Sequence, residues 1–103
     1  MGRDFKFYIR EHPKYEPVSD FYFDIRNQEI MAVLEMLTKG NKSEIEKMSS
    51  GERLYFSPIT KNDVREILIY CLKNKIDIYA SIISSCLQYM DEDIEYITEI
   101  MVF

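Results

Sequence analysis

The chain has few of the residues that divide a protein into flexible or membrane-bound parts. Glycine and proline occur three times each in 103 residues, so long flexible linkers are not expected and residues 1–103 are interpreted as a single globular domain. The longest apolar run, residues 67–72, is far shorter than the roughly 20 residues of a membrane span. The charged opening residues do not resemble a targeting signal. We therefore expect a cytoplasmic protein with no membrane partner.

Histidine and cysteine are also scarce, which argues against most catalytic and metal chemistry. His12 is the only histidine, and no candidate nucleophile lies near it in the sequence, so no serine or cysteine triad is indicated. Cys71 and Cys86 fall within apolar helical patterns and are interpreted as buried, reduced thiols. Two cysteines and one histidine are too few ligands for a structural zinc site. We expect a non-enzymatic protein without catalytic, cofactor-binding or metal-binding residues.

Two further motifs fail on spacing. Asp91, Asp93 and Glu95 alternate as in a calcium-binding loop, but the glycine at the turn and the distal glutamate of that loop are missing. The three glycines are too scattered for a phosphate-binding loop. Neither a metal nor a nucleotide is therefore predicted.

Basic residues are absent from the last part of the chain. All thirteen lysines and arginines lie at or before Lys75, and residues 1–75 also contain twelve acids. Residues 76–103 contain six acids and no base. The formal net charge of −5 therefore originates in the last 28 residues. Such asymmetry is typical either of a solvated acidic face or of a docking face for a basic partner. The residues assigned to partner binding are Asp91, Glu92, Asp93, Glu95 and Glu99.

Period-two patterns predict short strands. Apolar and polar residues alternate over residues 4–10 and 21–25, and a third short strand is expected over 53–57, closed by Pro58. His12-Pro13 and Glu16-Pro17 mark an irregular connection between the first two strands. Residues 91–103 fit either a helix or a strand, and we favour a short acidic helical turn followed by a strand from about Tyr96 that pairs with residues 4–10.

Helical spacing predicts three helices. The first spans residues 28–39, with Asn27 as its N-cap and Gly40 as its stop. Thr60 and Asp63 form a capping signal for a second helix that ends at Asn74, and Asp77 starts a third. Residues 41–52 are ambiguous but could include a short helix. Apolar stripes are expected on the second helix (Val64, Ile67, Leu68, Cys71 and Leu72) and on the third (Ile78, Ile82, Ile83, Cys86, Leu87 and Met90). The fold class is therefore α+β: a small antiparallel sheet of three to four short strands packed with three helices, the last two forming an αα-hairpin.

Two alternatives to protein docking remain. Residues 60–90 could be interpreted as a helix-turn-helix, but the second helix has no lysine or arginine to meet phosphates. A basic face of a nucleic-acid-binding regulator could instead come from Lys39, Lys42, Lys47, Arg53, Lys61 and Arg65. Eight tyrosines, together with Met31, Met36, Met90 and Met101, could supply the interface of a homo-oligomer.

The opening Gly2–His12 and the segment Asp20–Asn27 resemble small proteins of phages and prophages of low-GC bacteria. The resemblance covers about the first quarter of the chain and includes no functional motif. It implies an accessory protein that acts on a host component in the host cytoplasm. Compact acidic inhibitors of bacterial immunity, including anti-CRISPR proteins, are similar in size and charge. The leading hypothesis is therefore an inhibitor that occupies the basic groove of a host nucleic-acid-handling or defence protein.

Overall fold

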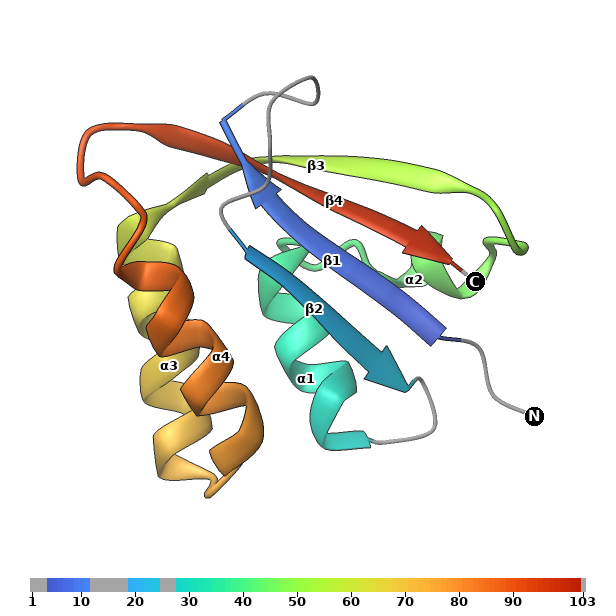
Figure 1. Ribbon diagram of the computed structural model, residues 1–103. Helices are drawn as coiled ribbons and strands as arrows, with labels where there is room; N and C mark the ends of the chain where they lie inside the picture. The colour runs from blue at the N-terminus through green and yellow to red at the C-terminus, as the bar shows by residue number, and fades with distance from the viewer. Residues whose placement is uncertain (1–3, 12–18, 25–27, 103) are drawn as a thin grey trace.

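A four-stranded antiparallel sheet with helices on one face forms the molecule (Figure 1). The computed structural model describes residues 4–11, 19–24 and 28–102. Within them lie the strands β1 (Asp4–Arg10), β2 (Ser19–Asp24), β3 (Arg53–Thr60) and β4 (Glu95–Val102). The helices are α1 (Gln28–Leu37), α2 (Lys42–Glu46), α3 (Lys61–Lys73) and α4 (Asp77–Leu87). The predicted α+β class is confirmed, with α2 as a fourth, short helix.

The strand order is β2-β1-β4-β3, so the first and last strands of the sequence pair in the centre of the sheet. Phe7 of β1 lies opposite Ile100 of β4, and β3 pairs with the other edge of β4. The predicted pairing of the C-terminal segment with residues 4–10 is therefore confirmed. The expected helical turn before it is wrong, because residues 91–94 form a turn without a helix. The third strand does not end at Pro58, since a register shift between Phe56 and Ile59 carries it on to Thr60.

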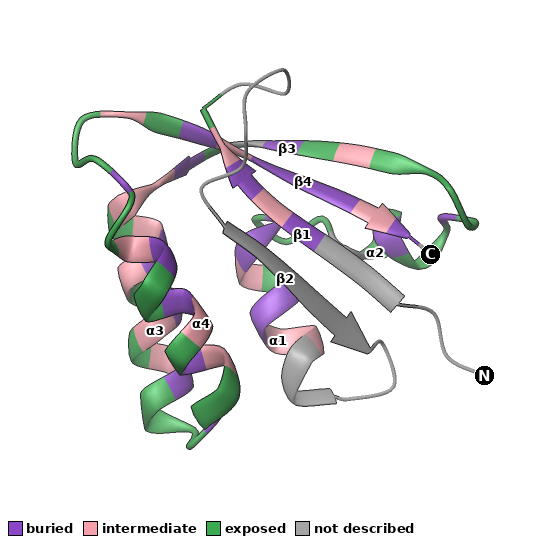
Figure 2. Cartoon of the chain, in the orientation of Figure 1, coloured by how far each residue is buried: buried purple, intermediate pink, exposed green. Residues whose placement is uncertain are grey.

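The hydrophobic core lies between the sheet and the helices. Along β4 the even-numbered residues from Tyr96 to Val102 are all buried, as a strand with one face on the core requires (Figure 2). Phe7 and Ile9 of β1, together with Val33, Leu34 and Leu37 of α1, belong to the same core cluster. No helix in the described residues is long and apolar enough to cross a membrane.

The ends of the helices follow the local signals. Thr60 and Asp63 form a complete capping box at the start of α3, and Asn74 is its C-cap, as predicted. At the end of α1, however, Lys39 already adopts a positive φ of 56°, and the Gly40 N–H bonds to the Glu35 carbonyl at 2.9 Å. The helix therefore stops before the predicted residue 39, and its left-handed turn begins at Lys39. The proposed cap Asn27 and the His12-Pro13 and Glu16-Pro17 connection lie outside the described residues.

The last two helices form the expected αα-hairpin, in which α3 and α4 contact each other. Val64, Ile67 and Cys71 of α3 and Ile83 and Cys86 of α4 are buried. The predicted stripes are wrong at two places. Leu72 is 60% and Ile78 is 73% exposed, and each lies next to the connection between the two helices.

Candidate protein-docking site

The acidic residues predicted to bind a partner are divided between the surface and the interior. Asp91, Glu92 and Asp93 are exposed in the connection between α4 and β4, and Glu95 is exposed at the first position of β4. Glu99, in the middle of β4, is only 1% exposed. The structure therefore brings together four of the five predicted carboxylates.

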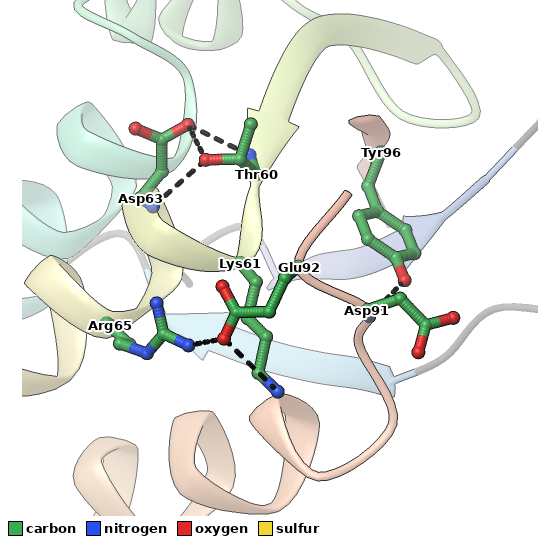
Figure 3. A network of polar contacts seen from close by, with 7 residues as sticks. All are labelled: Thr60, Lys61, Asp63, Arg65, Asp91, Glu92 and Tyr96. Carbon is green, nitrogen blue, oxygen red and sulfur yellow. Dashed lines mark hydrogen bonds and ion pairs between the residues drawn. The ribbon is translucent and has the colours of Figure 1, made fainter. Parts of the chain in front are cut away.

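The connection is anchored at its two ends. Tyr96 is 1% exposed, and its hydroxyl accepts a hydrogen bond of 2.7 Å from the backbone N–H of Asp91 (Figure 3). Met90, just before the connection, is buried in the core. Because the buried side chains of Met90 and Tyr96 hold the two ends of this connection, the acidic residues lie on a fixed segment. We call Asp91, Asp93 and Glu95 the acidic loop.

Glu92 is not part of the acidic loop because two basic side chains of α3 form ion pairs with it. Its Oε1 lies 3.9 Å from Lys61 Nζ, and it also forms an ion pair with Arg65 (Figure 3). Lys61 and Arg65 lie on the first turns of α3, which β3 places beside the α4–β4 connection. The charge of Glu92 is therefore compensated from within the chain. By contrast, Asp91, Asp93 and Glu95 form no ion pair with any described residue.

Glu99 corrects the prediction that all five carboxylates lie on one docking face. Alternation along β4 turns its side chain to the sheet face opposite the helices, between its register partners Tyr8 and Tyr55. Its Oε1 lies 3.4 Å from Nη2 of Arg10, and the two side chains are 2% and 11% exposed. The guanidinium of Arg10 also lies over the Tyr8 ring, 5.1 Å from its centroid. Because β4 is a central strand, its neighbours cover Glu99, which cannot meet a partner.

The capping box of α3 has an electrostatic role as well. The Thr60 N–H donates to Asp63 Oδ2 at 2.9 Å, the Asp63 N–H donates to Thr60 Oγ1, and Lys39 Nζ lies 2.9 Å from Asp63 Oδ2. Burial alone would raise the pKa of Asp63, but the bonds from Lys39 and Thr60 outweigh it and lower the pKa. The Asp63 carboxylate therefore stabilises the helix N-terminus in its ionised form.

These ion pairs also reduce the basic face expected of a nucleic-acid-binding regulator. Three of the six residues proposed for it, Lys39, Lys61 and Arg65, form ion pairs with Asp63 or Glu92.

No described group of histidine, cysteine, aspartate and glutamate could hold a metal ion. Cys71 and Cys86 are free and buried, as predicted, and burial raises the pKa of the Cys71 thiol.

The sequence patterns missed a second kind of surface. Large apolar side chains are exposed on the helical hairpin and the turn after it, namely Ile69, Leu72, Ile78 and Tyr89. Three of the four methionines proposed for an interface are half-buried, and Met90 is buried. Periodicity cannot identify such residues, because a helix with apolar side chains on more than one side does not reveal which side is covered.

Comparison of the chain with protein-family models, with curated proteins and with solved structures gives no match. The interpretation of the acidic loop therefore depends on its geometry and its charge.

Proposed function

We propose that the chain is a non-enzymatic protein-binding module that docks its acidic loop onto a basic surface of a partner. The observation behind this proposal is the exposure of Asp91, Asp93 and Glu95 on an anchored turn, without an ion pair to any described residue. Surface carboxylates that are not neutralised within their own chain keep their full charge for an oppositely charged partner. The docking surface is smaller than the sequence suggested, because Glu92 and Glu99 are excluded from it.

The partner chemistry follows from the sign of the charge. Basic grooves are typical of proteins that bind the phosphates of nucleic acids, and carboxylates on a fixed turn can take the place of phosphates in such a groove. We therefore propose that the chain is an inhibitor of a nucleic-acid-handling or defence protein, and that it is phage-encoded, as the resemblance of its first quarter suggests. Attraction of this kind is screened over about 8 Å at physiological ionic strength, so binding weakens as salt is added.

A matched pair of charge-reversed variants tests the acidic loop. The first variant changes Asp91, Asp93 and Glu95 to lysine. The control changes three exposed acids away from the loop, Glu11, Glu44 and Glu66, to lysine, so that the two variants have the same net charge. Both variants and the parent chain are immobilised and exposed to lysate of a low-GC bacterium at low and at high salt. The partner is defined as a protein that the parent and the control retain and that the loop variant does not.

The captured protein is then purified and titrated against all three chains. We expect the loop variant to lose at least about tenfold in affinity, which corresponds to about 1.4 kcal/mol. Excess duplex DNA should displace the parent chain from the partner, because both are proposed to occupy the same groove. The chain alone should cause no shift of a mixed duplex in a gel. Equal affinity of the loop variant and the control would contradict the docking proposal, and binding unaffected by DNA would contradict the inhibitory mechanism.

Self-association is a second candidate, which the exposed apolar residues of the helical hairpin favour. Ile69, Leu72 and Ile78 are each at least half exposed, and removing such side chains from water is the main driving force of association. Light scattering across a range of protein concentrations tests it. Replacement of Leu72 and Ile78 by serine should abolish any concentration-dependent increase in mass, whereas a constant monomer mass in the parent chain would exclude this candidate.

A further inference from the structure

The helix α4 carries apolar side chains on its outward side as well as on the side that faces the core. Four positions of this outward side follow one another at spacings of four, three and four residues, namely Ile78, Ile82, Ser85 and Tyr89. At 3.6 residues per turn they lie within about 60° of one another around the helix axis. Ile78 is 73% and Tyr89 is 69% exposed, while Ser85 is exposed and Ile82 is half-buried. We call these four residues the outer stripe.

Tyr89 lies beyond the last residue of α4 but stays in line with the stripe. Gln88, the C-cap, keeps right-handed helical angles, with φ of −63° and ψ of −24°. The Tyr89 N–H donates to the Cys86 carbonyl at 3.1 Å, and the next residue, Met90, is buried in the core. The backbone therefore continues in the helical sense as far as Tyr89 and holds its ring on the outward side.

The spacing of the outer stripe is that of a contact between two helices. Positions that alternate by three and four residues form the seam along which packed helices meet. Within the described part of the chain this seam has no covering element, since Ile78 and Tyr89 keep most of their surface exposed. The outer stripe is therefore suited to a helix from another molecule, and the charges at its two ends indicate which one.

The end of the stripe next to Ile78 is basic. Lys73 and Lys75 are exposed, and neither forms an ion pair with a described residue. With the neighbouring Asp77, this end has two bases and one acid, a net charge of +1. It lies at the connection between α3 and α4, the end of the hairpin away from the sheet (Figure 1).

The end of the stripe next to Tyr89 is acidic. Two residues after Tyr89 comes Asp91, the first residue of the acidic loop, whose carboxylates form no ion pair with a described residue. Adding Glu92 and its two basic partners on α3 gives four acids and two bases, a net charge of −2. The two ends of the outer stripe therefore have opposite charges even when all of these groups are counted.

We infer that the outer stripe binds the outer stripe of a second copy of the chain, with the two α4 helices antiparallel. In such a two-fold pair, Ile78 of each copy contacts Tyr89 of the other. The same register brings Lys75 of one copy level with the acidic loop of the other. A parallel pair would place like charges together at both ends. The antiparallel second copy satisfies the apolar stripe and both charged ends at once.

Self-pairing covers the acidic loop and therefore regulates it, a consequence that rests on the proposed function. Lys73 and Lys75 of one copy occupy the carboxylates that the basic partner would contact, so the pair and the partner compete. The outer stripe is much smaller than the roughly 20–30 residues per side of a standard interface, so the pair is weak and dissociates on dilution. Dilution therefore frees the acidic loop.

Sedimentation equilibrium of the full chain at low salt tests the pairing. Because the interface is small, the concentrations extend from about 10 µM to about 1 mM. We expect the average mass to rise with concentration from 12.3 kDa toward twice that value. Tyr89→Ser should weaken the pairing at least about tenfold, because each ring is used twice in a two-fold pair. The matched control is Tyr55→Ser, which removes a 48% exposed ring from β3 and should leave the pairing unchanged.

Two charge-reversed variants test the antiparallel arrangement. K73E combined with K75E, and D91K combined with D93K, should each weaken the pairing at least about tenfold, because like charges then meet at both ends. An equimolar mixture of the two variants should pair about as well as the parent chain, since each end again faces its opposite. K47E combined with R53E reverses two exposed bases elsewhere and has the same net charge as the first variant, so it should pair more tightly than that variant.

NMR of the parent chain tests whether the loop is covered. The amide shifts of Lys75 and Asp91 should change together between dilute and concentrated samples. A constant mass of 12.3 kDa over the whole range would overturn the inference, as would a mixture that pairs no better than either variant. Masses beyond two copies would replace the closed pair by an open chain, and an unchanged Asp91 amide would refute the covering of the loop. Failure of the proposed docking leaves all these results unaffected, because they need no partner.

Discussion

The buried pair of Glu99 and Arg10 allows a stringent test of the fold. Glu99→Gln keeps the size and one oxygen of the side chain but removes the charge opposite a guanidinium that is 11% exposed. Breaking a buried ion pair costs about 3–5 kcal/mol. The contact of 3.4 Å is longer than the usual bond between charged groups, and Glu99 Oε2 accepts no hydrogen bond from the described residues. We therefore expect a loss at the lower end, about 3 kcal/mol.

Urea unfolding of the parent chain and two variants measures this loss. The matched control is Glu95→Gln, the same substitution on the same strand at an exposed position, which should change the free energy of unfolding by less than about 0.5 kcal/mol. In a thermal scan, 3 kcal/mol corresponds to a decrease of about 12–24 °C in Tm for a domain of this size. Equal stabilities of the two variants would refute the placement of Glu99 in the interior and the central position of β4.

Three further predictions concern the helix cap, the anchored turn and the thiols. Asp63→Ala should cost about 1 kcal/mol in urea unfolding at neutral pH. Because folding lowers the pKa of Asp63, this stabilisation is present above the ordinary value of 3.8 and disappears as the pH falls through the folded pKa, so a cost that does not change with pH would contradict the assignment. Tyr96→Phe should cost about 1 kcal/mol and speed hydrogen exchange of the Asp91 amide, and unchanged exchange would show that the hydroxyl does not anchor the turn. Cys71 and Cys86 should react with a thiol reagent only after urea unfolding, and rapid labelling of the native chain would contradict their burial.

Local patterns predicted a large part of the fold. Alternation in β1 and β2, the capping box of Thr60 and Asp63, and the short connection between α3 and α4 each depend on residues close together in the sequence. The same information predicted the buried Cys71 and Cys86. The predictions were less accurate where a pattern was compatible with two answers, as for Leu72 and Ile78, since periodicity defines a side of a helix but not what covers it.

The candidate site was predicted only in outline. The sequence alone established that negative charge gathers after residue 75 and that bases are missing there. It could not establish which carboxylates lack an ion pair, because Glu92 pairs with Lys61 and Arg65, which lie about 30 residues earlier in the sequence. Nor could it show the two hollows beside β3, which are lined by β3 and by residues between Thr38 and Glu52.

What the sequence by itself determined is the identity of the elements and the total charge of the C-terminal segment, since both depend on neighbouring residues. The tertiary structure decided the order of the strands, and therefore which single side chains are buried and which are exposed. Glu95 and Glu99 have the same chemistry and lie on the same strand, yet one is exposed at the end of β4 and the other is buried at its centre. The physical reason is that burial is set by the neighbours that packing brings from distant parts of the chain.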